Sequence, residues 1–125
     1  MRVLVIDDDQ IVREMISRML KGAGYEVLEA TNGATGLAVV ASGINIDLVI
    51  TDIIMPEKEG IETIHELKRD FPEMKILAIS GGGKGESKNY LTIARSVGAN
   101  STLGKPFVKQ ELLDSVNGIL GEKVA

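Results

Sequence analysis

The sequence has no cysteine and no tryptophan, one histidine, and only 3% aromatic residues. Without cysteine, disulfides, thiolate metal sites and a cysteine nucleophile are all excluded. With a single histidine, a zinc site is almost excluded as well, because zinc in proteins is bound mainly by cysteine and histidine. The absence of thiol chemistry suits a reducing compartment, and the sequence therefore predicts a cytoplasmic protein.

Long hydrophobic runs and excess basic charge are lacking as well. The longest apolar runs are about five residues, whereas a helix needs roughly 20 to cross a bilayer, and the first residues do not have the layout of a signal peptide. The chain has 14 Lys and Arg against 18 Asp and Glu, a net charge of −4. A nucleic-acid surface needs a basic footprint and aromatic side chains on which bases stack. We therefore expect a soluble protein with neither a membrane nor a nucleic acid as its partner.

Aliphatic residues, by contrast, are plentiful and ordered. The 125 residues are 44% hydrophobic, enough for one domain with its own core. Short runs rich in Val, Ile and Leu alternate with longer segments of helical period, which is typical of βα units on a parallel sheet. The expected strands are residues 3–6, 25–30, 48–51, 76–79 and 100–103, and the expected helices are a segment from Asp9 to Gly22 or Gly24 and residues 34–41, 59–70, 87–97 and 111–120. Five such units fill the chain, so we expect residues 1–125 to form a single domain.

Two of these segments carry further information. In the first helix the apolar residues fall on one stripe, and Asp9 can cap its start. The apolar stripe consists of Ile11, Val12, Met15, Ile16, Met19 and Leu20. The strand at residues 48–51 is apolar throughout, which predicts a central position with both faces covered.

Polar residues follow the expected strands at their carboxyl ends, where open parallel sheets bind ligands. Asp7 and Asp8 follow the first strand, and Asp52 closes the third. Ser80 closes the fourth strand and Lys105 lies just past the fifth, while the second strand supplies no candidate, as expected for an edge.

If the strand order is 2-1-3-4-5, the first and third strands are neighbours and the three aspartates converge. Three carboxylates within a few ångströms repel one another strongly unless a cation lies between them. A site with oxygen ligands and no cysteine favours Mg²⁺.

In this order and at these separations, the motifs resemble the receiver domain of two-component response regulators. The resemblance rests on Val5-Ile6-Asp7-Asp8-Asp9, on Asp52-Ile53-Ile54-Met55-Pro56 with Gly60 beyond it, on Ser80, and on Lys105-Pro106-Phe107. It covers essentially the whole chain. It implies a flavodoxin-like (βα)5 fold, with a five-stranded parallel sheet in the order 2-1-3-4-5 and helices on both faces. It also implies a phosphorylated signalling protein rather than an enzyme.

The resemblance assigns roles to the candidate residues. Asp52 would be the phosphoacceptor, taking a phosphoryl group from a histidine kinase, a histidine phosphotransfer protein or a small acyl phosphate. Asp8, Asp52 and the backbone carbonyl of Ile54 would bind Mg²⁺ directly. Asp7 would act largely through water. Lys105 would pair with the phosphoryl oxygens as a point charge.

The resemblance also implies a switch. Ser80 would bond to the new phosphoryl group, and the face formed by the fourth helix, fifth strand and fifth helix would repack and bind a downstream protein. The usual aromatic switch residue, three positions before the lysine, is here Thr102, so no ring can swing inward. Switching would then depend on the Thr102 hydroxyl, on Tyr90 or on the glycine-rich segment at residues 81–85. The Lys105-Pro106 bond is a candidate for the cis isomer.

Three alternatives remain open. The first is a Mg²⁺-dependent phosphohydrolase that forms an aspartyl phosphate, although such an enzyme normally needs an acid two residues after its nucleophile, where Ile54 stands. The second is a docking domain that keeps only the fold, and the third is a nucleotide-binding flavodoxin-like protein, whose glycine pattern fails here. In the family, positions two beyond the phosphoacceptor and two beyond the serine tune dephosphorylation. Ile54 and Gly82 offer no acid or amide to position water, so we expect slow self-dephosphorylation.

Overall fold

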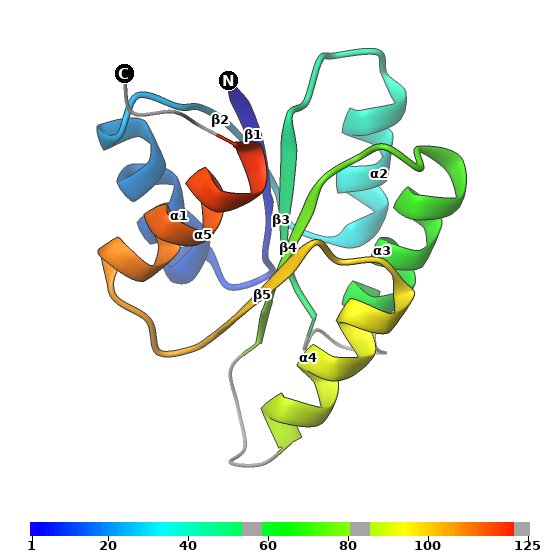
Figure 1. Cartoon of the computed structure of the whole chain (residues 1–125). Helices are drawn as coiled ribbons and strands as arrows, with labels where there is room; N and C mark the ends of the chain where they lie inside the picture. The colour runs from blue at the N-terminus through cyan, green and yellow to red at the C-terminus, as the bar shows by residue number, and fades with distance from the viewer. Residues whose placement is uncertain (54–58, 81–85, 122–125) are drawn as a thin grey trace.

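The computed structural model of the chain describes residues 1–53, 59–80 and 86–121, and within these ranges strands and helices alternate (Figure 1). The strands are β1 (Arg2–Ile6), β2 (Glu26–Ala30), β3 (Leu48–Asp52), β4 (Ile76–Ser80) and β5 (Ser101–Gly104). The helices are α1 (Gln10–Gly22), α2 (Gly33–Ala41), α3 (Glu59–Asp70), α4 (Glu86–Val97) and α5 (Lys109–Leu120). None of the helices in these ranges is both long and apolar enough to cross a membrane.

The five strands form one parallel sheet in the order β2-β1-β3-β4-β5. This is the order that the resemblance implied. Helices α1 and α5 cover one face of the sheet, and α2, α3 and α4 cover the other (Figure 1). All residues of β3 are buried, which confirms that the strand with no polar alternation is central, because both of its faces are covered.

The core has two layers, one on each face of the sheet, because successive side chains of a strand point to opposite sides. Val3 and Val5 of β1 pack with α1 and α5, whereas Leu4 and Ile6 pack with the helices of the other face. Every one of these side chains is at most 1% exposed. The apolar runs in the sequence therefore reflect burial on both faces of the sheet.

The element boundaries agree with the sequence prediction to within two residues. As predicted, Asp9 caps α1, and its Oδ1 accepts from the backbone N–H groups of Ile11 (2.9 Å) and Val12 (3.3 Å). Helix α5 begins two residues earlier than predicted, because the Glu111 carboxylate turns back and accepts from Val108 N at 2.9 Å. Strand β2 begins one residue later than predicted, since the N–H of Tyr25 still donates to the end of α1, at Leu20 O (3.1 Å).

The apolar stripe of α1 is only partly buried. Ile11 is 80% exposed and Met15 is 38% exposed, although both belong to the predicted apolar stripe. The buried line of the helix is Ile16 and Leu20, at 1% and 0%. The stripe is made of pairs of consecutive apolar residues, so it covers a wider arc of the helix surface than the sheet and α5 can bury. Side chains on one side of the stripe therefore stay in solvent.

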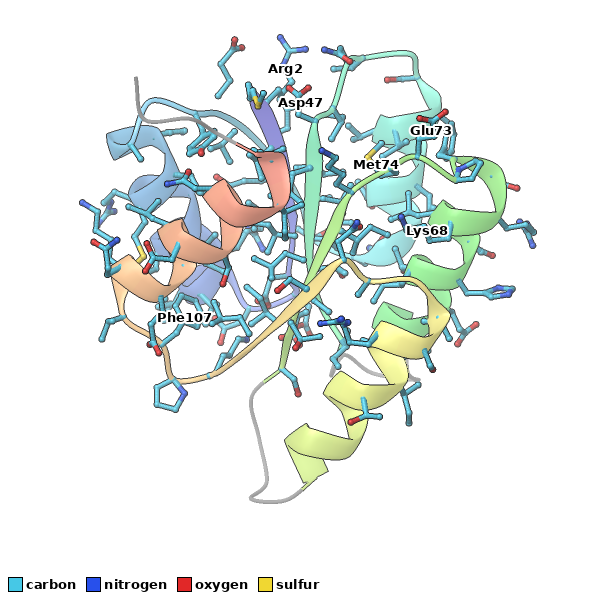
Figure 2. The ribbon with its side chains drawn as sticks, in the orientation of Figure 1. Arg2, Asp47, Lys68, Glu73, Met74 and Phe107 are labelled. Carbon is cyan, nitrogen blue, oxygen red and sulfur yellow. The ribbon has the colours of Figure 1, made fainter. Side chains whose placement is uncertain are left out.

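Polar contacts also join chain segments at the amino ends of the strands, which is the end of the sheet opposite the candidate site residues. The backbone N–H of Arg2 donates to the Asp47 carboxylate at 2.8 Å, and Lys68 Nζ donates to the carbonyl of Met74 at 2.6 Å (Figure 2). Lys68 Nζ also lies 3.4 Å from Asn100 Oδ1. These polar groups therefore fasten α3 and the strand ends to one another.

Gly60 lets α3 begin directly against the end of β3. A Cβ atom at this position would overlap the carbonyl oxygen of Asp52 and the Cα of Ile53. Backbone atoms cannot step aside as the tip of a side chain can, so we expect Gly60→Ala to lower the free energy of unfolding by about 3 kcal/mol. Urea unfolding followed by circular dichroism measures this.

Gly118→Ala is the matched control for Gly60→Ala. Gly118 is exposed on α5 and has no atom within 4 Å of the position that a Cβ would take. Alanine loses less entropy than glycine in a helix, so Gly118→Ala should raise the free energy of unfolding by about 0.5–1 kcal/mol. Equal stability of the two variants would contradict the close approach of α3 to β3.

Candidate functional site

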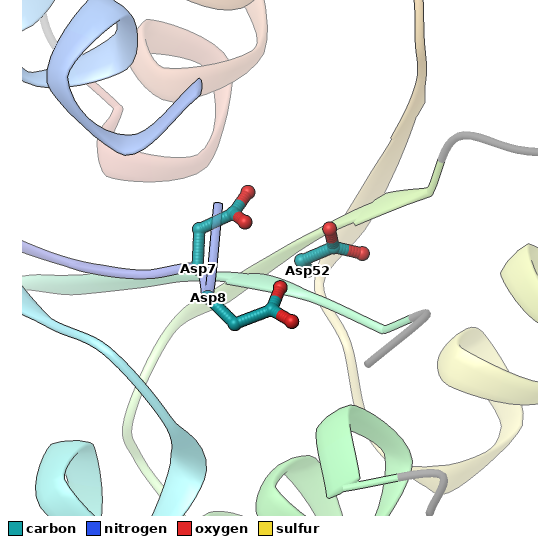
Figure 3. Close-up of side chains that lie close together, drawn as sticks. All are labelled: Asp7, Asp8 and Asp52. Carbon is teal, nitrogen blue, oxygen red and sulfur yellow. The ribbon is translucent and has the colours of Figure 1, made fainter. Parts of the chain in front are cut away.

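The carboxyl ends of β1 and β3 bring the predicted acidic residues together. Ile6 pairs with Thr51 in the parallel register, so the residues that follow, Asp7 and Asp52, lie side by side. The N–H of Asp7 continues the ladder to Ala30 O of β2, at 3.2 Å. Asp7, Asp8 and Asp52 gather at this edge of the sheet (Figure 3). The predicted convergence is confirmed.

The three aspartates form a group that could hold a metal ion. Each offers a carboxylate oxygen, and these oxygens all lie within 4.8 Å of one another. Asp7 and Asp52 are 1% and 6% exposed, whereas Asp8 faces solvent. Oxygen-only donors of this kind fit a hard divalent cation, and the exposed side of the group leaves room for water ligands.

Lys105 reaches the same group from the turn after β5. Its Nζ lies 2.9 Å from Asp52 Oδ2 and 3.4 Å from Asp7 Oδ2, and its side chain is 21% exposed. The backbone N–H of Lys105 donates to Ser80 O at 2.7 Å, which joins the turn to the end of β4. The Lys105-Pro106 bond, which the resemblance made a candidate for the cis isomer, is cis.

Burial, neighbouring charges and hydrogen bonds together shift the pKa values of Asp7 and Lys105. Burial raises the pKa of Asp7, and the charge of Asp52 adds to the rise, while the N–H of Asp9 and the ammonium of Lys105 oppose it. Burial alone would lower the pKa of Lys105, but its bond to Asp52 and the charges of both carboxylates outweigh that and raise it.

The two pKa shifts have opposite consequences for stability. Because the pKa of Lys105 is raised, its stabilising contribution is present at neutral pH and is lost as the pH rises through that pKa. Because the pKa of Asp7 is also raised, its ionised form costs stability at neutral pH, and the cost is relieved as the pH falls through that pKa. A metal cation bound beside Asp7, in addition to the Lys105 ammonium, would also reduce the cost of ionised Asp7.

The predicted switch residues lie on neighbouring strands. Ser80 ends β4, is 0% exposed, and pairs with Gly104 of β5. Thr102 is half-buried and pairs with Ala78, two residues before Ser80. Since Leu103 packs with α1 and α5, alternation turns Thr102 to the α4 face, together with Ala78 and Ser80. Thr102 thus lies on the edge strand β5, two strands away from β3 and its Asp52.

Some predicted residues lie outside the described ranges. Ile54, whose carbonyl was the third predicted metal ligand, and Gly82, one of the positions expected to tune dephosphorylation, both fall there. So does the glycine-rich segment at residues 81–85, and the side chain of Tyr90 is likewise outside the described part.

The sequence interpretation missed two residues that support the site. Arg13 of α1 donates from Nη1 to the carbonyl of Asp7 at 2.9 Å and from Nε to Glu29 Oε1 at 2.9 Å. Glu29 belongs to β2, so this strand contributes to the site after all. The available signal was the position of Arg13 in the first turn of α1, four residues after the cap Asp9.

Comparison with known proteins identifies the family. The family model described as "Response regulator receiver domain" matches residues 3–117. The chain belongs to the response regulator receiver domains. Such domains are the phosphoryl-accepting parts of two-component systems and interact with histidine kinases. This chain is therefore a signalling domain.

The relatives and solved structures agree with this assignment. The receiver domain is 37% identical over 118 residues to the phosphate regulon transcriptional regulatory protein PhoB of Pseudomonas aeruginosa, covering 94% of this chain and 51% of that protein. It is 33% identical over 120 residues to response regulator MprA of Mycobacterium avium, covering 96% and 51%. A putative response regulator from Chloroflexus aurantiacus superposes with a TM-score of 0.86 at 31% identity, covering 97% and 98%. The chain spans about half the length of the curated relatives it matches.

Proposed function

We propose that this receiver domain accepts a phosphoryl group on Asp52 in a two-component phosphorelay. The observation that carries the proposal is the position of Lys105, whose ammonium lies 2.9 Å from the Asp52 carboxylate at the edge where the three aspartates meet. A carboxylate is repelled by an anionic phosphoryl group, and a fixed ammonium beside it reduces that repulsion.

In the proposed step, an oxygen of the Asp52 carboxylate attacks the phosphorus of a phosphohistidine on a histidine kinase or a histidine phosphotransfer protein. The new O–P bond forms as the P–N bond breaks, and the leaving imidazole nitrogen keeps the electron pair and takes a proton. Lys105 moves from pairing two carboxylates to neutralising the transferred oxygens. The product is an aspartyl phosphate.

Asp8 and Asp52 are the proposed direct ligands of Mg²⁺, with Asp7 acting through water and the backbone carbonyl of Ile54 as a further ligand. When bound, Mg²⁺ would neutralise negative charge on the phosphoryl oxygens. The oxygen-only donors and the partial burial of the group support this choice of metal.

The proposed output of phosphorylation is a change in the surface that binds a downstream protein. Ser80 would bond to the phosphoryl group, and since Ser80 and Thr102 share the α4 face of the sheet, the change would reach the surface of α4, β5 and α5, where a downstream protein would bind. We further propose that the domain comprising residues 1–125 signals in the cytoplasm through protein contacts and that it dephosphorylates itself slowly.

The test is incubation of the protein with MgCl₂ and acetyl phosphate, followed by intact-mass measurement. We expect one phosphoryl adduct, located to Asp52 by borohydride reduction and peptide mapping, and no adduct when EDTA replaces MgCl₂. Absence of any adduct would overturn the proposal. Steady release of phosphate from many monoesters, without a lasting adduct, would instead favour the phosphohydrolase.

A further inference from the structure

Arg13 links the acidic turn to two other elements. Its guanidinium donates to the backbone carbonyl of Asp7 and to the Glu29 carboxylate, each at 2.9 Å. The Arg13 side chain is 12% exposed and that of Glu29 is 33% exposed, so the guanidinium is mostly shielded from water while the Glu29 carboxylate remains partly in solvent. A guanidinium presents several N–H groups in a fixed fork, which allows one side chain to hold two acceptors on different elements.

The carbonyl that Arg13 holds belongs to the peptide group between Asp7 and Asp8. A peptide group is planar, so fixing its oxygen fixes the torsion angles on both sides, ψ of Asp7 and φ of Asp8. Those angles decide in which direction the Asp8 side chain leaves the backbone. Asp8 is the exposed member of the acidic group, and it has less packing around it than Asp7 or Asp52.

Other bonds hold the turn on either side of this peptide group. The N–H of Asp7 donates to Ala30 O at 3.2 Å, and the N–H of Asp9 donates to Asp7 Oδ1 at 2.9 Å. Asp9 is fixed to α1 through its capping bonds. Within the described part of the chain, the orientation of the Asp7 carbonyl itself is held by Arg13.

We propose that Arg13 is a positioning residue of the metal site. It sets the Asp7-Asp8 peptide group, and through it the place of the Asp8 carboxylate relative to Asp7 and Asp52, while Glu29 orients the guanidinium. This rests on the proposed Mg²⁺ binding of the receiver domain. Groups that orient metal ligands typically change metal affinity by about 10- to 100-fold when removed, and a similar dependence is expected here.

The sign of the effect separates positioning from simple charge. Arg13 carries a positive charge near a cation site, so by electrostatics alone its removal would strengthen Mg²⁺ binding. If Arg13 acts by positioning, its removal weakens Mg²⁺ binding instead. Arg13→Lys keeps the charge but cannot hold both acceptors in the same geometry, and it should also weaken the binding.

The experiment is an NMR titration of the folded, ¹⁵N-labelled protein with MgCl₂, following backbone amide shifts. Arg13→Met is expected to raise the Mg²⁺ dissociation constant about 10- to 100-fold and to shift the Asp8 amide in the absence of Mg²⁺. Arg18→Met, an exposed arginine on the same helix, is the matched control and should leave both measurements unchanged. At Mg²⁺ concentrations above the weakened dissociation constant, phosphorylation of Arg13→Met by acetyl phosphate should return to the wild-type rate.

Each outcome decides the proposal. Mg²⁺ binding by Arg13→Met that is as tight as in the wild type, or tighter, would overturn the role of Arg13 and leave the proposed function intact. An equal loss in Arg18→Met would overturn it too, because the effect would then not be specific to the turn. If Arg13→Met fails to fold, unchanged affinity in Arg13→Lys is decisive against the proposal. If the wild type binds no Mg²⁺, the proposed metal site fails and the role of Arg13 fails with it.

Discussion

Asp52→Asn is expected to abolish the phosphoryl adduct that the wild type forms with MgCl₂ and acetyl phosphate. The side-chain amide has nearly the same shape as the carboxylate but lacks a nucleophilic anionic oxygen. Asp52 is 6% exposed and lies beside Lys105, so the substitution changes the chemistry of the site with little change in packing. Intact mass after incubation gives the result directly.

Asp9→Asn is the matched control for Asp52→Asn. Asp9 belongs to the same acidic run, but its carboxylate caps α1, and asparagine is as good a cap as aspartate. This variant should label like the wild type. A phosphoryl adduct on Asp52→Asn, or its loss in Asp9→Asn, would show that the phosphoacceptor has been assigned to the wrong aspartate.

Lys105→Met should slow phosphorylation by about 10²- to 10³-fold, the usual effect of removing one fixed group that stabilises developing charge. Methionine keeps much of the length of the lysine stem but removes the ammonium that lies 2.9 Å from Asp52 and 3.4 Å from Asp7. The rate of adduct formation at saturating MgCl₂ and acetyl phosphate measures the effect.

Lys109→Met separates this local effect from the loss of one positive charge in general. Lys109 is exposed in the first turn of α5, just after the connection that carries Lys105, and its substitution should leave the rate unchanged. Thermal melting of both variants checks that they are folded. An unaltered rate in folded Lys105→Met would mean that the ammonium takes no part in phosphoryl transfer.

Much of the architecture was predictable because its signals are local. A strand buried on both faces shows consecutive apolar residues rather than alternation, as at Leu48, Val49 and Ile50 of β3, and a helix that packs on a sheet carries an apolar stripe. The cap at Asp9 is likewise local, since its partners are two and three residues away. The candidate site residues stood out because they are polar at the ends of apolar runs.

The arrangement of these residues depends on contacts between distant parts of the chain. Lys105 meets Asp7 across 98 residues of sequence, and that meeting requires the strand order and register that only the folded sheet establishes. In the sequence, Ile11 and Ile16 belong to the same apolar stripe. In the structure, only Ile16 is buried. Packing against α5 and the sheet decided between them.

The strands and helices and the chemical types of the site residues could be predicted from the sequence alone, since these follow from local periodicity and from polar residues at strand ends. Three contacts could be seen only in the folded domain: Lys105 bridges two carboxylates, Gly60 lies against the end of β3, and Arg13 holds the Asp7 carbonyl. The physical reason is that a side-chain contact is set by the relative placement of elements, and that placement results from packing over the whole domain.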